Sequence, residues 1–407
     1  MDRLRRLHEH LRAERAPLGG ATVAGSSPSP IGVVDLSAWT WGDPTRDVAA
    51  ERAAAARALG DSFERTGFAL VVGHGVDPAA LRAMREKALT FFNKPQSEKM
   101  LFSEGKGYGF GGYLDQEENG AQLLGDFGQP ADHVESVSLA RGIGTSGLSM
   151  SQDRPTVDGE APQEADEADP RRPTVDAGNG GDSIALATAG AVPPVTDGVE
   201  GFAEAVEEYF AGVRGFCEIV ERVAEAALGL PPLAFNEVAR GFSGGVRLAY
   251  YPDPEKRPRR QGQQRYGAHV DSGGITVLSR DAVNPTGLEI LVDDEWLPVP
   301  PLADSIVLNV GALLSRYTNG RWKAAQHRVV NGGGQRLSIV TGCVSFRSDA
   351  VVGVLPECVD ESGTKFEPVL AGEYISERAA MHRLDYTEGK TEEELEQLSA
   401  EIRAYQV

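Results

Sequence analysis

Two histidines and one aspartate are spaced as ligands for a single metal ion. His269 and Asp271 are separated by one residue, and His327 lies further along the chain. In a β-strand the side chains alternate between two faces, so His269 and Asp271 would point the same way, about 6–7 Å apart. The third ligand must then come from another strand. Two imidazoles and one carboxylate, with other positions open, favour iron(II) used with dioxygen, whereas four ligands would indicate structural zinc.

A His-x-Asp pair alone is common in proteins that bind no metal. The addition of His327, and of an Arg-x-Ser sequence shortly after it, favours a metal site over a chance pairing. The other histidines are not expected to bind iron. His74 is predicted to lie in a turn, and the remaining four are predicted to be exposed to solvent, namely His8, His10, His133 and His382.

The Arg-x-Ser sequence offers a binding site for a carboxylate beside the metal. Arg336 and Ser338 share one face of the strand predicted at 336–346. A guanidinium and a hydroxyl suit the far carboxylate of a dicarboxylic 2-oxo acid, whose other end would chelate iron. Each charge-assisted hydrogen bond would contribute about 1.5–3 kcal/mol. Tyr251 could donate a further hydrogen bond. The alternative role for Arg336 is a structural ion pair.

Contacts to a substrate are less clearly marked. Arg247 shares a strand face with Tyr251 and could meet an anionic substrate group, although a structural role is favoured by the sequence alone. Four aromatic residues are candidates for the pocket wall, with a core role as the equal alternative, namely Tyr108, Phe110, Tyr113 and Phe346.

The elements that position these residues are predicted to be mainly β-strands with flanking helices. Helices are predicted at about 44–66, from Asp77 onward, at 201–228, and after a capping box formed by Thr391 and Glu394. Many short strands without alternating helices indicate an antiparallel sandwich or barrel. The predicted strands are 246–251, 266–270, 274–279, 287–292, 296–299, 305–309, 326–330 and 336–346.

Composition excludes several functional classes. The net charge of −20 argues against nucleic-acid or anionic-membrane partners, which require basic surface. The three cysteines form no CxxC pair, which fits a reducing compartment. The first residues lack the apolar stretch of a secretory signal, and no apolar run approaches the ~20 residues of a membrane span. These features predict a cytoplasmic protein that binds a small-molecule substrate, with no evident obligate protein partner.

One segment departs from the rest in composition. Residues 142–198 are rich in Gly, Pro, Asp, Glu and Ser, and they are predicted to be disordered because they hold too little apolar surface to offset chain entropy. The predicted organisation has four parts. These are an N-terminal region (1–141) packed on the core, the acidic insertion (142–198), the β-core (199–350), and a C-terminal extension with the final helix (351–407).

An ordered set of motifs resembles the iron(II)/2-oxoglutarate-dependent dioxygenases of the isopenicillin N synthase-like family. The matching segments are 31–36, 67–75, 91–99, 247–252, 266–278, 287–289, 309–311, 318–321, 327–329 and 336–338. The resemblance implies a double-stranded β-helix (jelly roll) with flanking helices. It also implies iron(II) bound by His269, Asp271 and His327, and 2-oxoglutarate bound by Arg336, Ser338 and Tyr251.

The implied activity is oxidation of a small molecule, with dioxygen consumed and succinate and carbon dioxide released. Hydroxylation is the expected outcome, with desaturation or ring closure needing only different positioning. Asp271 argues against the halogenating relatives, which replace that carboxylate. Two departures stand out: Ala249 replaces an asparagine found in many members, and compact members lack the acidic insertion. The alternatives are an oxidase of the same fold that needs no 2-oxoglutarate, and a non-catalytic binding or sensing protein.

Overall fold

The computed structural model describes residues 29–40, 47–103, 112–115, 119–140, 194–280 and 283–404. The pocket candidates Tyr108 and Phe110 and most of the acidic insertion lie outside the described residues. The end of that insertion lies inside them. Val195–Gly198 forms the 3-10 helix η3, and Val195 is fully buried, so the prediction of disorder extended too far at its C-terminal end.

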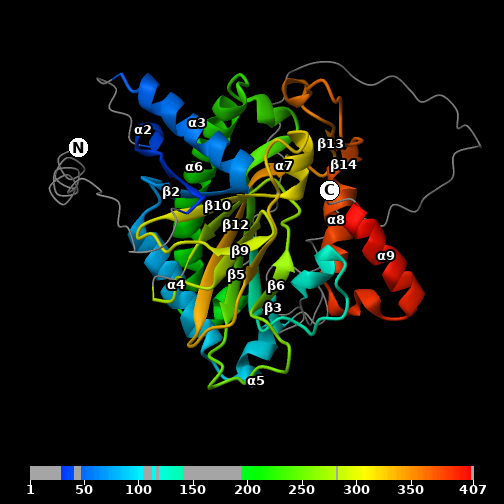
Figure 1. Ribbon diagram of the computed structural model, residues 1–407. Coiled ribbons are helices and arrows are strands. Elements are labelled where there is room, and N and C mark those ends of the chain that lie inside the picture. Colours follow the sequence, from blue (N-terminus) through cyan, green and yellow to red (C-terminus); the bar gives the residue numbers. More distant parts are fainter. Residues whose placement is uncertain are drawn as a thin grey trace, which may run out of the picture. The chain divides into compact units, whose positions relative to one another are not determined.

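The larger of two main sheets has eight strands in the order β1-β2-β10-β7-β12-β5-β4-β3 (Figure 1). All neighbours in it pair antiparallel except β1 and β2. In that order the strands are Gly32–Asp35, Phe68–Val72, Ile306–Val310, Ile275–Ser279, Arg336–Phe346, Ala239–Tyr251, Glu135–Ala140 and Tyr113–Asp115.

The smaller sheet has four antiparallel strands in the order β6-β11-β8-β9. These are Tyr266–His269, His327–Val329, Leu288–Val292 and Glu295–Pro298. One apolar cluster contains Ala249, Leu278 and Val307 from the large sheet together with Leu288 and Ile290 from the small one. The two sheets therefore pack face to face, which confirms the predicted antiparallel sandwich.

All eight strands predicted between 246 and 346 are present, and seven of them agree to within one residue at each end. The exception is β5, which begins at Ala239 instead of 246. Its first half contains Gly241, Ser243, Gly244 and Gly245, residue types with low strand propensity. Pairing with β12 on one side and β4 on the other makes this stretch extended in spite of its composition.

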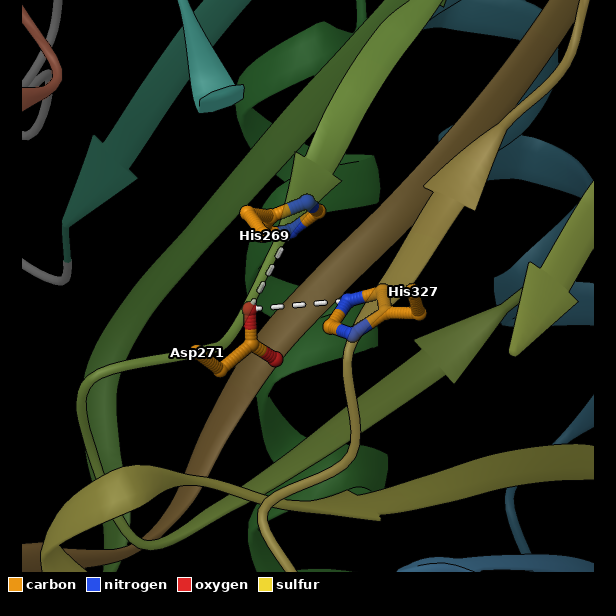
Figure 2. Close-up of side chains that lie close together, drawn as sticks. All are labelled: His269, Asp271 and His327. Atoms are coloured by element: carbon orange, nitrogen blue, oxygen red, sulfur yellow. Dashed lines mark ion pairs between the residues drawn. The ribbon is translucent and has the colours of Figure 1, made fainter. Parts of the chain in front are cut away.

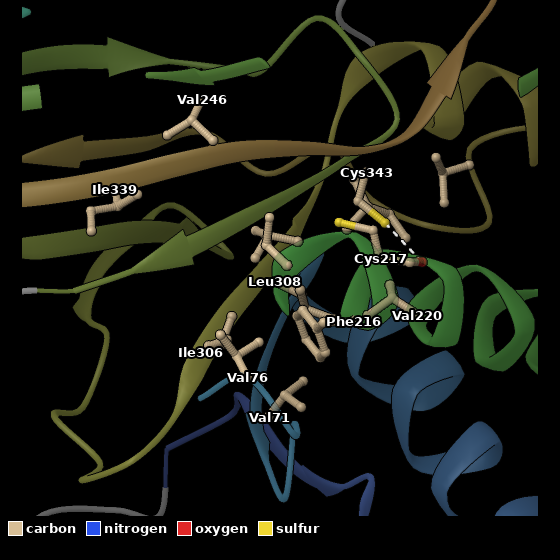
Figure 3. Packing of buried hydrophobic residues seen from close by; sticks show 14 of the residues in the cluster. Val71, Val76, Phe216, Cys217, Val220, Val246, Ile306, Leu308, Ile339 and Cys343 are labelled. Atoms are coloured by element: carbon tan, nitrogen blue, oxygen red, sulfur yellow. Dashed lines mark hydrogen bonds between the residues drawn. The ribbon is translucent and has the colours of Figure 1, made fainter. Parts of the chain in front are cut away.

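Three long helices cover the other face of the large sheet (Figure 1). They are α3 (Ala49–Thr66), α4 (Pro78–Phe92) and α6 (Phe202–Leu228). Val71, Phe216, Leu308 and Ile339 belong to the main apolar core, which lies between these helices and the sheet (Figure 3). Gly67 ends α3 with φ +71°, and a Cβ there would lie 2.0 Å from the carbonyl oxygen of Lys323. Only glycine allows the chain to pass directly from α3 into β2.

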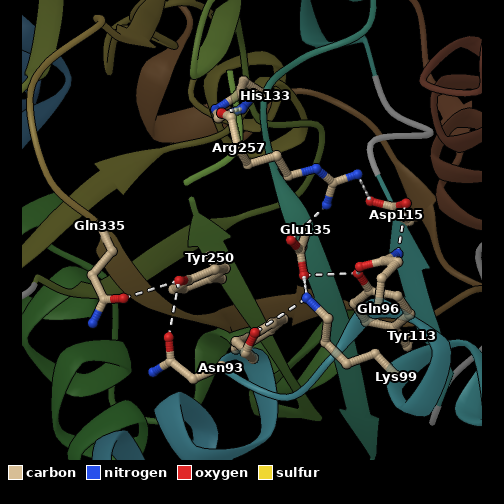
Figure 4. A network of polar contacts seen from close by, with 11 residues as sticks. Asn93, Gln96, Lys99, Tyr113, Asp115, His133, Glu135, Tyr250, Arg257 and Gln335 are labelled. Atoms are coloured by element: carbon tan, nitrogen blue, oxygen red, sulfur yellow. Dashed lines mark hydrogen bonds and ion pairs between the residues drawn. The ribbon is translucent and has the colours of Figure 1, made fainter. Parts of the chain in front are cut away.

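A buried polar network joins the free edge of the large sheet to the helices (Figure 4). Glu135 of β4 forms ion pairs with Lys99 and Arg257, and it accepts a hydrogen bond of 2.7 Å from the Tyr113 hydroxyl. Arg257 also pairs with Asp115 at 2.6 Å. Burial, followed by the charge on Glu135, raises the pKa of Tyr113 well above its usual range. The phenol therefore stays protonated and acts as a donor.

Two C-terminal helices, α8 (Ala371–Met381) and α9 (Glu392–Ala404), pack against the 3-10 helix η2 (Gly120–Leu124). Leu123, Met381 and Ile402 form a small apolar cluster, and the Ser399 hydroxyl donates to the carbonyl of Gly125 at 2.7 Å. The elements here are β13 (Val351–Val352), η5 (Pro356–Cys358), β14 (Val369–Leu370), α8 (Ala371–Met381), η6 (Leu384–Thr387) and α9 (Glu392–Ala404).

The predicted capping box is confirmed, because the Glu394 carboxylate accepts from the Thr391 backbone and the Thr391 hydroxyl accepts from the Glu394 backbone.

The remaining short elements are α2 (Ser37–Thr40), α5 (Gln96–Lys99), η1 (Met100–Phe102), η4 (Ala234–Glu237) and α7 (Ala312–Tyr317). Within the described ranges, none of the helices has the length and apolar character required to cross a membrane.

Candidate metal and carboxylate site

The three predicted metal ligands converge on one point (Figure 2). Asp271 Oδ1 lies 3.5 Å from His269 Nε2 and 3.7 Å from His327 Nε2. The ligand atoms of all three residues lie within 4.8 Å of one another. His269 is the last residue of β6 and is paired directly with His327, the first residue of β11. Among the described residues, no second group of three or more His, Cys, Asp or Glu side chains meets the same condition.

Asp271 does not lie in a strand, which agrees with the predicted bounds 266–270 but not with the use of strand alternation to place its side chain. Strand β6 ends at His269, and Asp271 belongs to the loop that leads to β7. The reason is that β11 begins at His327, so the backbone beyond His269 has no strand partner on that side. The Asp271 carbonyl instead accepts a hydrogen bond of 2.7 Å from the backbone of Ala312.

Backbone carbonyls hold both imidazoles in the orientation that metal binding requires. His269 Nδ1 lies 2.9 Å from the Gly267 carbonyl oxygen, and His327 Nδ1 lies 3.1 Å from that of Ala325. A carbonyl only accepts, so each Nδ1 carries the hydrogen and each Nε2 presents its lone pair to the shared point. Tyr266 and Phe68 pack edge-on against His269 and His327, with ring centroids 4.7 and 5.4 Å apart.

Two side chains from the large sheet hold the carboxylate of Asp271. The Thr276 hydroxyl and the Asn309 amide, the latter at 2.7 Å, both donate to Asp271 Oδ2. Thr276 of β7 and Asn309 of β10 are paired neighbours, which explains how they reach the same oxygen. Oδ1 is left facing the two imidazoles. Neither supporting residue was predicted from the sequence.

The electrostatics keep His327 and Asp271 in their metal-binding forms. Burial, and next the neighbouring His269, lowers the pKa of His327 to about 4. Burial acts to raise the pKa of Asp271, but His327, His269 and the Thr276 hydroxyl outweigh it and hold that pKa well below its ordinary value. A neutral imidazole and an ionised carboxylate result at neutral pH. Two nitrogens and one oxygen on one side of an ion fit iron(II), with positions left over for small molecules.

Arg336 and Ser338, the residues predicted to bind a carboxylate, are also in contact with each other, and we call this pair the carboxylate fork. Arg336 Nη1 donates to the Ser338 hydroxyl at 2.6 Å, and the guanidinium lies over the ring of Tyr251, 5.0 Å from its centroid. Arg336 is paired with Tyr251 across β12 and β5, so all three side chains share the face that looks toward the small sheet. Arg336 and Ser338 are 0% and 2% exposed.

Two further arginines surround this fork. Burial and then the charge of Arg336 lower the pKa of Arg265, and the same two causes lower that of Arg280 to about 10. Arg265 is 1% exposed and Arg280 is 8% exposed. Three guanidinium groups near one another in a low-dielectric interior create a strongly positive region that an anionic ligand would stabilise.

Arg247 lies beside the metal site. Its Nη1 is 3.5 Å from the Tyr266 hydroxyl, and its guanidinium is 5.2 Å from the centre of the same ring.

His382, predicted to be exposed, lies 3.1 Å from the Tyr266 hydroxyl through Nε2. That expectation was wrong because the packing of α8 against η2 brings the C-terminal segment to the metal site. His133, likewise predicted to be exposed, is fully buried, with Nε2 3.0 Å from the Arg257 carbonyl oxygen.

Phe346 has the core role that the sequence left open. It belongs to the main apolar core and packs edge-on against Tyr317. By strand alternation it would share a face with Arg336, but the pairing of β12 with β5 shifts between Thr341 and Cys343. This irregularity places Phe346 in the cluster that contains Leu337 and not with the fork.

The fold and the site together define a jelly-roll protein with a two-histidine, one-carboxylate metal site. Two family models match the chain. The model of the 2OG-Fe(II) oxygenase superfamily matches residues 242–344, and that of the N-terminal region of non-haem dioxygenases in morphine synthesis matches residues 31–153. Residues 242–344 therefore form a domain of the 2OG-Fe(II) oxygenase superfamily.

Similar proteins include plant enzymes. A 1-aminocyclopropane-1-carboxylate oxidase of Dendrobium crumenatum is 38% identical over 30% of this chain and 37% of its own length. Gibberellin 20 oxidase 4 of Arabidopsis thaliana is 26% identical over 74% of this chain and 67% of its own length. The match to the first of these relatives therefore spans little more than a third of that protein.

Solved structures share the fold. A 2OG-Fe(II) oxygenase family protein from Caulobacter crescentus has a TM-score of 0.61 at 25% identity, covering 86% of this chain and 98% of its own. A full-length Neurospora crassa protein, solved in complex with alpha-KG and thymine, has a TM-score of 0.61 at 22% identity and covers 86% of this chain and 96% of its own. These likenesses confirm the jelly roll expected from the motifs.

Replacing a ligand should abolish iron binding without unfolding the protein. We expect the purified chain, reconstituted with iron(II) without air, to bind one ion, and His327→Ala or Asp271→Ala to lose at least about tenfold in affinity. His74→Ala is the matched control, because His74 lies in the turn after β2 and outside the triad. Iron content after gel filtration is the measurement, and equal iron in His327→Ala and wild type would refute the assignment.

The buried His327 should make the metal-free protein sensitive to acid. Its pKa lies near 4 when folded and at 6.5 ordinarily. The unfolded chain therefore binds a proton first as the pH falls. The contribution to stability is complete above pH 6.5 and is lost as the pH falls toward 4, by about 3 kcal/mol at most. Urea unfolding with a chelator present should show a steeper loss over this window for wild type than for His327→Gln. Parallel curves would contradict the prediction.

Proposed function

We propose that this protein is an iron(II)- and 2-oxoglutarate-dependent oxygenase that oxidises a small molecule and releases succinate and carbon dioxide. The observation that carries the proposal is the presence of two sites between the two sheets. One is a three-ligand site that leaves room on an iron ion, and the other is a buried Arg336–Ser338–Tyr251 site for a carboxylate. A 2-oxo dicarboxylate has a chelating end for the first and a carboxylate for the second.

Each residue has a defined task in this scheme. Iron(II) bound at the triad would supply activation of dioxygen coupled to decarboxylation of 2-oxoglutarate. Arg336 and Ser338 would bind the far carboxylate and set the orientation of the cosubstrate, with Tyr251 packed against the guanidinium. Thr276 and Asn309 would fix the Asp271 carboxylate so that Oδ1 stays available.

Arg247 supports a substrate that carries an anionic group. Its guanidinium is held against Tyr266, whose ring packs on His269, and this places a cation beside the metal ligands. Tyr108 and Phe110 remain predicted pocket residues. We place the catalytic region at 199–350, with 351–407 as an extension that contacts it through His382. A cytoplasmic location stays a prediction from the sequence.

A second candidate is an iron(II) oxidase that needs no 2-oxoglutarate. It is favoured by the 38% identity to a 1-aminocyclopropane-1-carboxylate oxidase. In such an enzyme the Arg336–Ser338 site would bind the carboxylate of the substrate itself. A non-catalytic role is disfavoured because all three ligands are present and oriented.

Succinate formation separates these candidates. We expect the iron-loaded protein to convert 2-oxoglutarate to succinate in air, slowly alone and faster when a substrate is added. Without air, iron(II) and 2-oxoglutarate should together give a weak visible absorption band. The measurement is succinate by mass spectrometry, with Asp271→Ala as the blank. Oxygen consumption that is independent of 2-oxoglutarate would favour the oxidase.

Removal of the guanidinium should weaken binding of 2-oxoglutarate specifically. We expect Arg336→Gln to raise the apparent KM for 2-oxoglutarate about 100-fold, the effect of losing charge-assisted hydrogen bonds in a buried site, while iron binding stays intact. Arg321→Gln is the control, because Arg321 pairs with Glu64 at the surface. Initial rates over a range of 2-oxoglutarate concentrations provide the test. An unchanged KM in Arg336→Gln would assign Arg336 to the structural role.

A further inference from the structure

A cavity lies close to the metal ligands. Its volume is about 410 Å³, and it is bounded by α7, the end of β8, the segment before β11, and the C-terminal segment. Small-molecule sites in proteins commonly have volumes of about 300–1,000 Å³. The cavity is therefore large enough for a compact organic ligand.

The cavity lies behind the metal ligands and not in front of them. Its wall includes Val270, which stands between His269 and Asp271, and Gln326, which precedes His327. Side chains alternate along extended backbone, so a residue next to a ligand projects away from the ion. Ala325, also in the wall, provides the carbonyl that holds His327 Nδ1 on the side opposite Nε2. A ligand in the cavity would contact the backbone that carries the triad without reaching the ion.

The lining is positively charged. Arg65, Arg316, Lys323 and Arg378 line the cavity, against two carboxylates, Asp293 and Asp294. In the described part of the chain, no ion pair joins Arg316, Lys323 or Arg378 to a carboxylate. The charged residues of the lining therefore favour an anion, although the net charge of the whole chain is −20.

Arg316 is the most deeply buried of the cations that line the cavity, so an anionic ligand would stabilise it most. Its side chain is 8% exposed, and Nη2 donates to the Glu367 carbonyl at 2.9 Å, while its buried Nε has no acceptor among the described residues. The guanidinium lies 4.8 Å from the centre of the Phe366 ring and 5.8 Å from that of Tyr374. These rings fix the guanidinium in place but do not neutralise its charge.

We propose that this cavity is a binding site for a small organic anion with an apolar body, such as a medium-chain carboxylate. The cations would bind the carboxylate, and an apolar portion would contact Val270, Leu291, Val292 and Phe366, which line the same space. The site is distinct from the iron and 2-oxoglutarate sites, and its existence does not depend on the proposed reaction.

Calorimetry with octanoate tests the proposal on the full-length, iron-loaded protein without air. We expect one octanoate to bind per chain, with an affinity that falls as salt is raised. Octylammonium, which has the same apolar body and the opposite charge, should not bind. A saturating concentration of 2-oxoglutarate should leave octanoate binding unchanged, because the two sites are separate. Absence of octanoate binding up to about 10 mM would overturn the proposal.

Charge reversal locates the site. Lys323 is exposed, so Lys323→Glu is expected to fold, and it should weaken octanoate binding by about tenfold or more. Lys256→Glu makes the same charge change at an exposed position outside the cavity and should have little effect. Arg378→Gln provides a second variant in the cavity wall. Displacement of octanoate by 2-oxoglutarate, or equal weakening by Lys256→Glu, would refute a site behind the metal ligands.

Discussion

The pairing of β6 with β11 is the constraint on which the site depends. It places His269 directly opposite His327, with ring centroids 4.1 Å apart. A slip of one residue in either strand would turn one imidazole to the other face of the sheet and remove a ligand. The register of β11 is also fixed by its other neighbour, β8. That pairing places His327 beside Ile290, which belongs to the apolar cluster between the sheets.

The space between the two sheets has a negatively charged end, the first pole, and a positively charged end, the second pole. Asp271 places a negative charge at the triad, where Thr276 and Asn309 stabilise it, whereas Arg336 with Arg265 and Arg280 makes the other end positive. Burying such groups is unfavourable unless each charge meets a partner. A cation at the first pole and a carboxylate at the second would satisfy both. The binding of metal and of cosubstrate is therefore expected to stabilise the fold as well as to enable chemistry.

The residues that the sequence predicted are those whose position follows from local pattern. The triad, the Arg336–Ser338 fork and the strand bounds depend on alternation and on turns, which are readable over a few residues. Thr276 and Asn309 were missed because their shared contact with Asp271 arises from pairing between β7 and β10. Phe346 lies on the face opposite to the one that strand alternation predicts, because β12 has an irregularity in its pairing. His382 lies near the metal site because α8 packs against η2, which is remote in sequence. These contacts depend on tertiary structure, which no local pattern contains.

Strand β6 is too short to hold a metal ligand rigidly by itself, since it spans only Tyr266–His269. Its support comes from outside the strand. The Asp132 carboxylate accepts from the backbone of both Gly267, at 2.8 Å, and Gly120, at 2.7 Å, which ties β6 to η2. The C-terminal helices pack on η2, and His382 contacts Tyr266. The position of His269 is therefore set by segments remote in sequence, which makes the C-terminal extension a structural part of the metal site.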